Sequence, residues 1–131
     1  PGKKRLTGAC PAILYKDDAP FMVLGAPGGA WIVSAVLQTI LNVVDHGMSA
    51  LEAVSAPRFD CQGDVVNVEG RVPRWVCEEL EERGLRVERD LASYGPYPTR
   101  SARVHAIVVD GERGKLDGGA DPRGYGVALA V

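Results

Sequence analysis

The segment from Gly25 to Asp45 joins a glycine-rich turn to a long stretch with the apolar spacing of a helix. Gly25-Ala26-Pro27-Gly28-Gly29 ends a short apolar run, and residues 30–45 follow directly. Two apolar rows run along that stretch: Ile32, Val36, Ile40 and Val43 form the first, and Val33, Leu37, Leu41 and Val44 form the second. An apolar surface this wide has to be mostly covered. Because its β-branched residues are mediocre helix formers, we expect tertiary packing to hold this helix.

The rest of the chain predicts a small set of strands and helices around this junction. Residues 12–16 and 21–25 are expected to form a β-hairpin across the acidic, proline-containing turn 17–20. Ser49 and Glu52 have the spacing of a capping box and predict a short helix that ends before Pro57. A further helix is predicted at 74–83, and further strands at 65–68, 85–88, 104–109 and 127–131. This order predicts an α+β fold with helices packed on a mainly antiparallel sheet.

Charge and cysteine content exclude several kinds of partner and cofactor. The 131 residues include 15 Lys and Arg against 17 Asp and Glu, a net charge of −2, so no positive field attracts nucleic acid. The longest apolar stretch contains polar residues and is too short to cross a bilayer, so we predict no membrane association. Cys10, Cys61 and Cys77 lack CxxC spacing, and we predict neither a metal site nor a cofactor.

The Gly28-Gly29 pair lies where main-chain N–H groups are accessible to an anion. Glycine lets a ligand approach the backbone, and a helix N-terminus leaves N–H groups unpaired and carries partial positive charge. Such a turn binds a phosphate or carboxylate, or stabilises the oxyanion of acyl transfer. A tight turn without any ligand has the same local pattern, so the residues alone leave these interpretations open.

Arg58 and the turn Asp121-Pro122-Arg123 also have two interpretations. A guanidinium group at either position is suited to holding a substrate carboxylate. A structural ion pair at a turn accounts for the same residues equally well. The pattern favours neither interpretation, and spatial contacts are needed to decide between them.

Motifs along nearly the whole chain resemble the γ-glutamyltransferases, in the same order. They are Pro1-Gly2-Lys3, Leu6, Pro11, Gly25-Ala26-Pro27-Gly28-Gly29, Val36-Leu37-Gln38, Asn42-Val43-Val44-Asp45-His46-Gly47-Met48, Glu52-Ala53-Val54, Ala56-Pro57-Arg58-Phe59 and Gly118-Gly119-Ala120-Asp121-Pro122-Arg123. The resemblance is to the C-terminal part of the small subunit of these N-terminal nucleophile hydrolases. It implies that residues 1–131 are a single segment of an αββα sandwich, incomplete without upstream residues.

The resemblance implies a two-step acyl transfer. In the family, a precursor cleaves itself and exposes a threonine whose hydroxyl attacks a γ-glutamyl amide such as glutathione, while its free amine serves as base. That threonine lies upstream of Pro1, and Thr7, Thr39 and Thr99 do not match its context. The chain alone is therefore expected to be inactive and to need the remainder of the precursor or the large subunit as its partner. Family members are often periplasmic or extracellular; the segment itself does not indicate a localisation.

The resemblance also assigns roles to four residues. Gly28 and Gly29 match the pair whose backbone N–H groups bind the oxyanion, so valine at Gly28 is expected to lower turnover strongly with modest loss of folding. Thr7 and Gly8 occupy the positions of a serine pair that often holds the substrate's α-carboxylate. Thr7 keeps a hydroxyl donor, whereas Gly8 offers only its N–H group, so an acylase with another acyl preference also fits. A non-catalytic module that binds an anionic ligand at the glycine pair, or serves in assembly, is the alternative.

Overall fold

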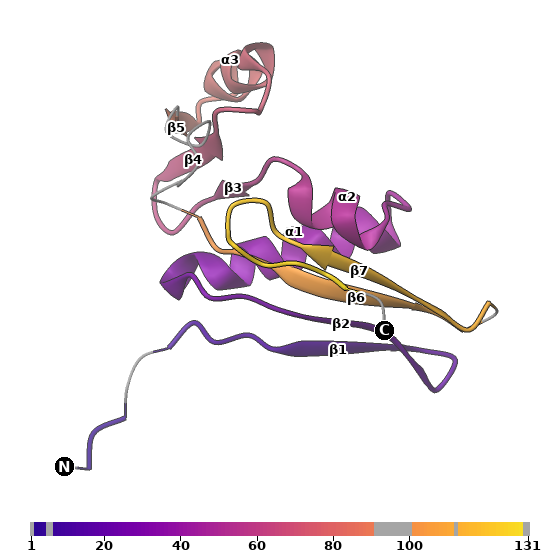
Figure 1. Cartoon of the computed structure of the whole chain (residues 1–131). Helices are drawn as coiled ribbons and strands as arrows, with labels where there is room; N and C mark the ends of the chain where they lie inside the picture. The colour runs from indigo at the N-terminus through magenta and orange to yellow at the C-terminus, as the bar shows by residue number, and fades with distance from the viewer. Residues whose placement is uncertain (1, 5–6, 91–100, 112, 130–131) are drawn as a thin grey trace.

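The computed structural model describes residues 2–4, 7–90, 101–111 and 113–129, and its elements form an α+β fold, as predicted (Figure 1). The strands are β1 (Ala12–Lys16), β2 (Ala19–Gly25), β3 (Phe59–Asp60), β4 (Val65–Glu69), β5 (Arg86–Asp90), β6 (His105–Asp110) and β7 (Lys115–Ala120). The helices are the 3-10 turn η1 (Gly29–Trp31), α1 (Ile32–Val44), α2 (Ala50–Ser55) and α3 (Arg74–Glu82).

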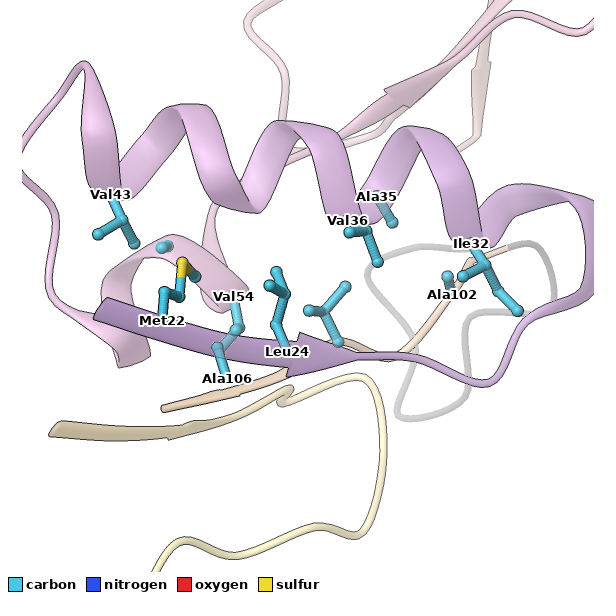
Figure 2. Close-up of a cluster of buried hydrophobic side chains, with 11 residues drawn as sticks. Met22, Leu24, Ile32, Ala35, Val36, Val43, Val54, Ala102 and Ala106 are labelled. Atoms are coloured by element: carbon cyan, nitrogen blue, oxygen red, sulfur yellow. The ribbon is translucent and has the colours of Figure 1, made fainter. Parts of the chain in front are cut away.

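The main sheet has the order β1-β2-β6-β7, and every pair in it is antiparallel. Helices α1 and α2 lie on one face of this sheet (Figure 1). The core between the helices and the sheet includes Met22 and Leu24 from β2, Val36 from α1 and Val54 from α2 (Figure 2). This packing fixes the junction between β2 and α1 at one end of the sheet.

A smaller sheet, β3-β4-β5, lies together with α3 at the top of the view in Figure 1, on the side of the main sheet that carries α1. Strands β4 and β5 are parallel, with Val65 opposite Arg86 and Glu69 opposite Asp90. Parallel neighbours need a crossover connection, which α3 supplies here. The expectation of a mainly antiparallel arrangement is therefore confirmed for the main sheet, while this pair is the parallel exception.

Local sequence signals account for the hairpin and for the start of α2. The hairpin turn contains only Asp17 and Asp18, both with positive φ (51° and 60°), so β2 begins two residues earlier than predicted. Positive φ at both central residues matches the twist of the flanking strands, and aspartate tolerates it better than most residues. The capping box of Ser49 and Glu52 is confirmed, with each residue binding the other's backbone N–H group.

One strand prediction is wrong, and β7 is missing from the predicted strands. Residues 127–129 form no strand, and residues 130–131 lie outside the described part of the chain. The strand instead lies earlier, as β7, where Gly118 and Gly119 weaken the strand pattern in the sequence. A Cβ on Gly119 would overlap the backbone of Ala50, so the glycine allows α2 to approach the sheet closely.

The burial of α1 differs from the expectation. Its first apolar row faces the core, with Ile32, Val36 and Val43 buried. The residues of its second row, Val33, Leu37, Leu41 and Val44, are between 40% and 54% exposed. Within the described residues the helix is therefore covered on one side only. None of the helices described here has the length and apolar content needed to span a bilayer.

Candidate functional site

The turn between β2 and α1 has a backbone conformation that requires glycine. Gly28 has φ 149° and ψ 15°, and Gly29 has φ 62° and begins η1, which continues into α1. A Cβ on Gly28 would lie 2.5 Å from Cα and 2.6 Å from Cβ of Ala102, whereas a Cβ on Gly29 would meet no atom within 4 Å. Gly28 is thus required by both conformation and packing, and Gly29 by conformation alone.

The N–H groups of this turn are accessible. Both glycines are exposed, and no hydrogen bond between described residues starts from the N–H group of Gly28 or Gly29. No acidic side chain lies in the first turn of η1 or of α1 to compete for them. Unpaired N–H groups at the start of a helix form a suitable environment for negative charge.

Thr7 and Gly8 lie next to this turn. A Cβ on Gly8 would overlap the carbonyl oxygen of Gly29 and lie 3.2 Å from its carbonyl carbon, so the Gly8 backbone packs directly against the turn. Thr7 is exposed, and its Oγ1 accepts a hydrogen bond of 3.1 Å from the N–H group of Ala9. The structure therefore brings Gly8, Gly28 and Gly29 together, with Thr7 on the adjoining exposed segment.

Four buried charged residues form an ion-pair network. Arg58, Glu69, Asp121 and Arg123 are each at most 7% exposed. Nε and Nη2 of Arg123 each lie 2.6 Å from one oxygen of Glu69, and its Nη1 lies 3.0 Å from Oδ1 of Asp121. Nη2 of Arg58 lies 2.6 Å from Oδ2 of Asp121. Both arginines thus form structural ion pairs, which decides between the two interpretations that the sequence left open.

Ion pairing in this network outweighs the cost of burial for both carboxylates. Burial raises the pKa of Glu69, but the hydrogen bond and charge of Arg123 leave that pKa below its ordinary value. Burial likewise raises the pKa of Asp121, and the charges of Arg58 and Arg123 bring it below the usual range. Both carboxylates are therefore ionised at neutral pH.

Burial and the like charge of Arg123 lower the pKa of Arg58. Burial also disfavours the charged form of Arg123, but its contact with Glu69 outweighs this and raises its pKa. The two arginines thus differ in how well their surroundings compensate for desolvation, and Arg123 is the better paired.

Sequence reasoning missed two residues of this arrangement. Glu69 follows a predicted strand, and an acidic side chain at a strand end is the one clue to it. Of its three arginine partners, Arg71 is two positions away, whereas Arg58 and Arg123 are 11 and 54 positions away. The sequence gives no sign of a role for Ala102, because this residue matters only through its position against Gly28. Pairings between distant segments of this kind come from the fold.

Within the described residues, the glycine turn coincides neither with a metal-binding cluster nor with the hollow on the main sheet. No group of three or more His, Cys, Asp or Glu side chains in the described ranges is placed to hold a metal ion. An open hollow on the main sheet is lined by residues of β2, β6 and β7 and by residues 127–129, and neither Gly28 nor Gly29 lines it.

The comparisons with known proteins agree with one another. The sequence profile described as Gamma-glutamyltranspeptidase matches residues 1–131. A "Glutathione hydrolase proenzyme" from Bacillus subtilis (strain 168) is 36% identical over 132 residues, which cover 100% of this chain and 21% of that protein. An "Acylase ACY 1 proenzyme" from Pseudomonas sp. (strain SE83) is 34% identical over 131 residues, covering 100% and 22%.

A solved structure, the gamma-glutamyltranspeptidase from Pseudomonas nitroreducens complexed with L-DON, has a TM-score of 0.82 and 31% identity. The match covers 100% of this chain and 66% of that one. The chain therefore spans about two thirds of the solved chain and about a fifth of the length of the curated relatives.

Proposed function

Because the chain belongs to the gamma-glutamyltranspeptidase family, we propose that residues 1–131 are the C-terminal portion of a small subunit that transfers or hydrolyses γ-glutamyl or related acyl amides. The glycine turn carries this proposal. Its two glycines are exposed, and their N–H groups have no acceptor among the described residues and lie at the start of a helix. Gly28 and Gly29 bind the oxyanion, and the remainder of the precursor supplies the nucleophile.

The chemistry proceeds in two steps. A threonine hydroxyl oxygen, supplied from outside this segment, attacks the amide carbonyl carbon, and negative charge develops on the carbonyl oxygen. The N–H groups of Gly28 and Gly29 donate to that oxygen and stabilise the charge. The C–N bond then breaks, the amine leaves with the proton from the hydroxyl, and an ester remains. Water or an acceptor amine attacks the ester, which releases the acyl product and restores the hydroxyl.

The proposal requires that the chain be inactive by itself. The coding sequence upstream of Pro1 is expected to contain a threonine at a self-cleavage junction. Full-length protein should then release nitroaniline from γ-glutamyl p-nitroanilide, and purified residues 1–131 should release none. Nitroaniline release by the isolated chain would refute the missing-nucleophile part of the proposal. A start codon directly before Pro1 would favour the non-catalytic anion-binding module instead.

The Gly8 position favours a second acyl preference. A serine at this position would carry a Cβ that overlaps the carbonyl oxygen of Gly29, so this backbone arrangement has no room for a serine side chain unless it shifts. One donor for the substrate's α-carboxylate is therefore missing, and only Thr7 retains a hydroxyl. The relative named as an acylase, 34% identical along this chain, is consistent with an acyl donor other than a γ-glutamyl compound.

Two anilides test this preference. γ-Glutamyl p-nitroanilide carries the α-carboxylate, and 4-aminobutyryl p-nitroanilide is the same donor without it. A site that binds the carboxylate through several groups rejects the truncated donor by about 10⁴-fold in kcat/KM. We expect a difference below about 10-fold for this protein, because Gly8 has lost its side chain. Strong rejection of the truncated donor would show that the α-carboxylate is recognised in spite of Gly8.

A further inference from the structure

The residues 102–104 lie between the glycine turn and the buried network. On one side, the N–H group of Arg103 donates to the carbonyl of Pro27 at 3.0 Å, and Ala102 fills the space where a Gly28 side chain would stand. On the other side, Nη2 of Arg58 donates to the carbonyl of Ala102 at 2.9 Å. The N–H group of Val104 donates to Oδ2 of Asp121 at 2.8 Å. One short segment thus connects the network to the turn through main-chain contacts.

The two arginines of the network are bonded differently. All three guanidinium nitrogens of Arg123 have acceptors, which include both oxygens of Glu69 and the carbonyls of Val54 and Ala56. Arg58 uses only Nη2, which reaches both Asp121 and Ala102. Its Nε and Nη1 are buried without a hydrogen-bond partner within the described structure, and Nε is 3.9 Å from the nearest oxygen of Glu69.

A buried guanidinium group with two unpaired nitrogens is a poor stabilising element, because those donors lose water without compensation. Stability alone therefore does not account for Arg58. The contacts that it does make fix the carbonyl of Ala102 and the carboxylate that holds the N–H group of Val104. Both contacts act on the segment that packs against Gly28.

We propose that Arg58, held by Asp121, is a positioning residue that sets the direction of the Gly28 and Gly29 N–H groups through residues 102–104. This inference rests on the proposed function, in which those groups bind the oxyanion. Without the bond from Arg58 to Ala102, residues 102–104 move away from Gly28 and the turn relaxes with them. Misdirected donors weaken binding of the transition state more than binding of the substrate, so the loss appears in kcat.

The test compares Arg58→Lys with Arg123→Lys in the full-length protein. Lysine at either position keeps the charge and loses the planar fork, but Arg123 makes no hydrogen bond to residues 102–104. Arg58→Lys is expected to lower kcat for γ-glutamyl p-nitroanilide by about 10- to 100-fold while KM changes less than about twofold. Arg123→Lys is expected to lower the melting temperature at least as much and kcat by less than about threefold.

A second readout does not depend on activity. Amide hydrogen exchange at Arg103 reports the bond to Pro27, and it should be faster in Arg58→Lys than in the unmodified protein but unchanged in Arg123→Lys. Asp121→Asn, which keeps the side-chain shape, provides a second variant if Arg58→Lys does not accumulate as folded protein. Equal effects of the two lysine variants on kcat and on exchange would refute the positioning role. Faster exchange specific to Arg58→Lys in a protein without acyl-transfer activity would retain that role and reject the proposed function.

Discussion

Replacing Gly28 by alanine tests both the conformation of the turn and its use. The added Cβ would lie 2.5 Å from Cα and 2.6 Å from Cβ of Ala102, closer than real Cβ atoms approach. Overpacking of this kind costs about 1–3 kcal/mol, and a non-glycine residue held at φ 149° costs about 1–3 kcal/mol more. The free energy of unfolding should therefore fall by roughly 2–6 kcal/mol unless the turn shifts.

Gly29→Ala is the matched control. Its Cβ meets no atom within 4 Å, so only the left-handed backbone contributes, at about 1–2 kcal/mol. Structure thus corrects the expectation that a side chain at Gly28 causes modest loss of folding, because Ala102 occupies the space that the side chain needs. Valine at Gly28 is expected to be worse than alanine.

The assay measures both stability and turnover in the full-length protein. Urea denaturation gives the free energy of unfolding, and release of nitroaniline from γ-glutamyl p-nitroanilide gives kcat. If Gly28→Ala relieves the overlap by moving the turn, an N–H donor is misplaced and kcat falls by about 10²- to 10³-fold. Equal stability of the two alanine variants would refute the packing argument. Unchanged kcat in a folded Gly28→Ala variant would assign the turn a structural role only.

Three further predictions concern stability. Glu69 and Asp121 have lowered pKa values in the folded protein, so their contribution to the free energy of unfolding is complete above the ordinary carboxyl pKa of about 4 and is lost as pH falls below it. Urea unfolding measured from pH 6 downward should show this loss, and a Glu69→Gln/Asp121→Asn variant should show a flatter dependence of stability on pH. Asp117→Ala should lower the free energy of unfolding by about 1–3 kcal/mol, because the N–H group of Ala50 loses its 2.6 Å partner. Asp117→Asn keeps an acceptor and should lose less stability, so equal losses in the two variants would contradict the role of this hydrogen bond. Gly119→Ala should cost about 1–3 kcal/mol or more through overlap with the backbone of Ala50, whereas Gly111→Ala, with open space around its Cβ, should leave the melting temperature nearly unchanged.

Local chemistry made much of the fold predictable from the sequence. The apolar row of Ile32, Val36 and Val43 forms the core face of α1, although the sequence also predicted that the second row would be covered. The spacing of Ser49 and Glu52 identified the start of α2. These signals depend on residues within a few helical turns of one another, so they can be recognised in the sequence without knowledge of the fold. Strand β7 lacked such a signal, since its two glycines weaken the strand pattern; Gly119 serves the close approach of α2, and Gly118 lies opposite Ala128.

The candidate site also contains some residues that local sequence patterns identify and others whose roles appear only in the fold. Gly28 and Gly29 were identifiable because a strand, two glycines and a helix are consecutive. The pairing of Arg58 with Asp121 was not, because the two residues are 63 positions apart and either arginine also fitted a ligand role. The role of Ala102 could not be predicted from the sequence, because it depends on where this small side chain lies in the fold.

The second apolar row of α1 has a practical consequence for handling this segment. Four aliphatic side chains along one helix, each between 40% and 54% exposed, form an apolar stripe on its outer side. A stripe of this kind attracts detergent, hydrophobic dyes and other copies of itself during purification. Hydrophilic replacements along it, such as Leu37→Lys, offer a way to keep a recombinant form of residues 1–131 dispersed without disturbing the core or the glycine turn.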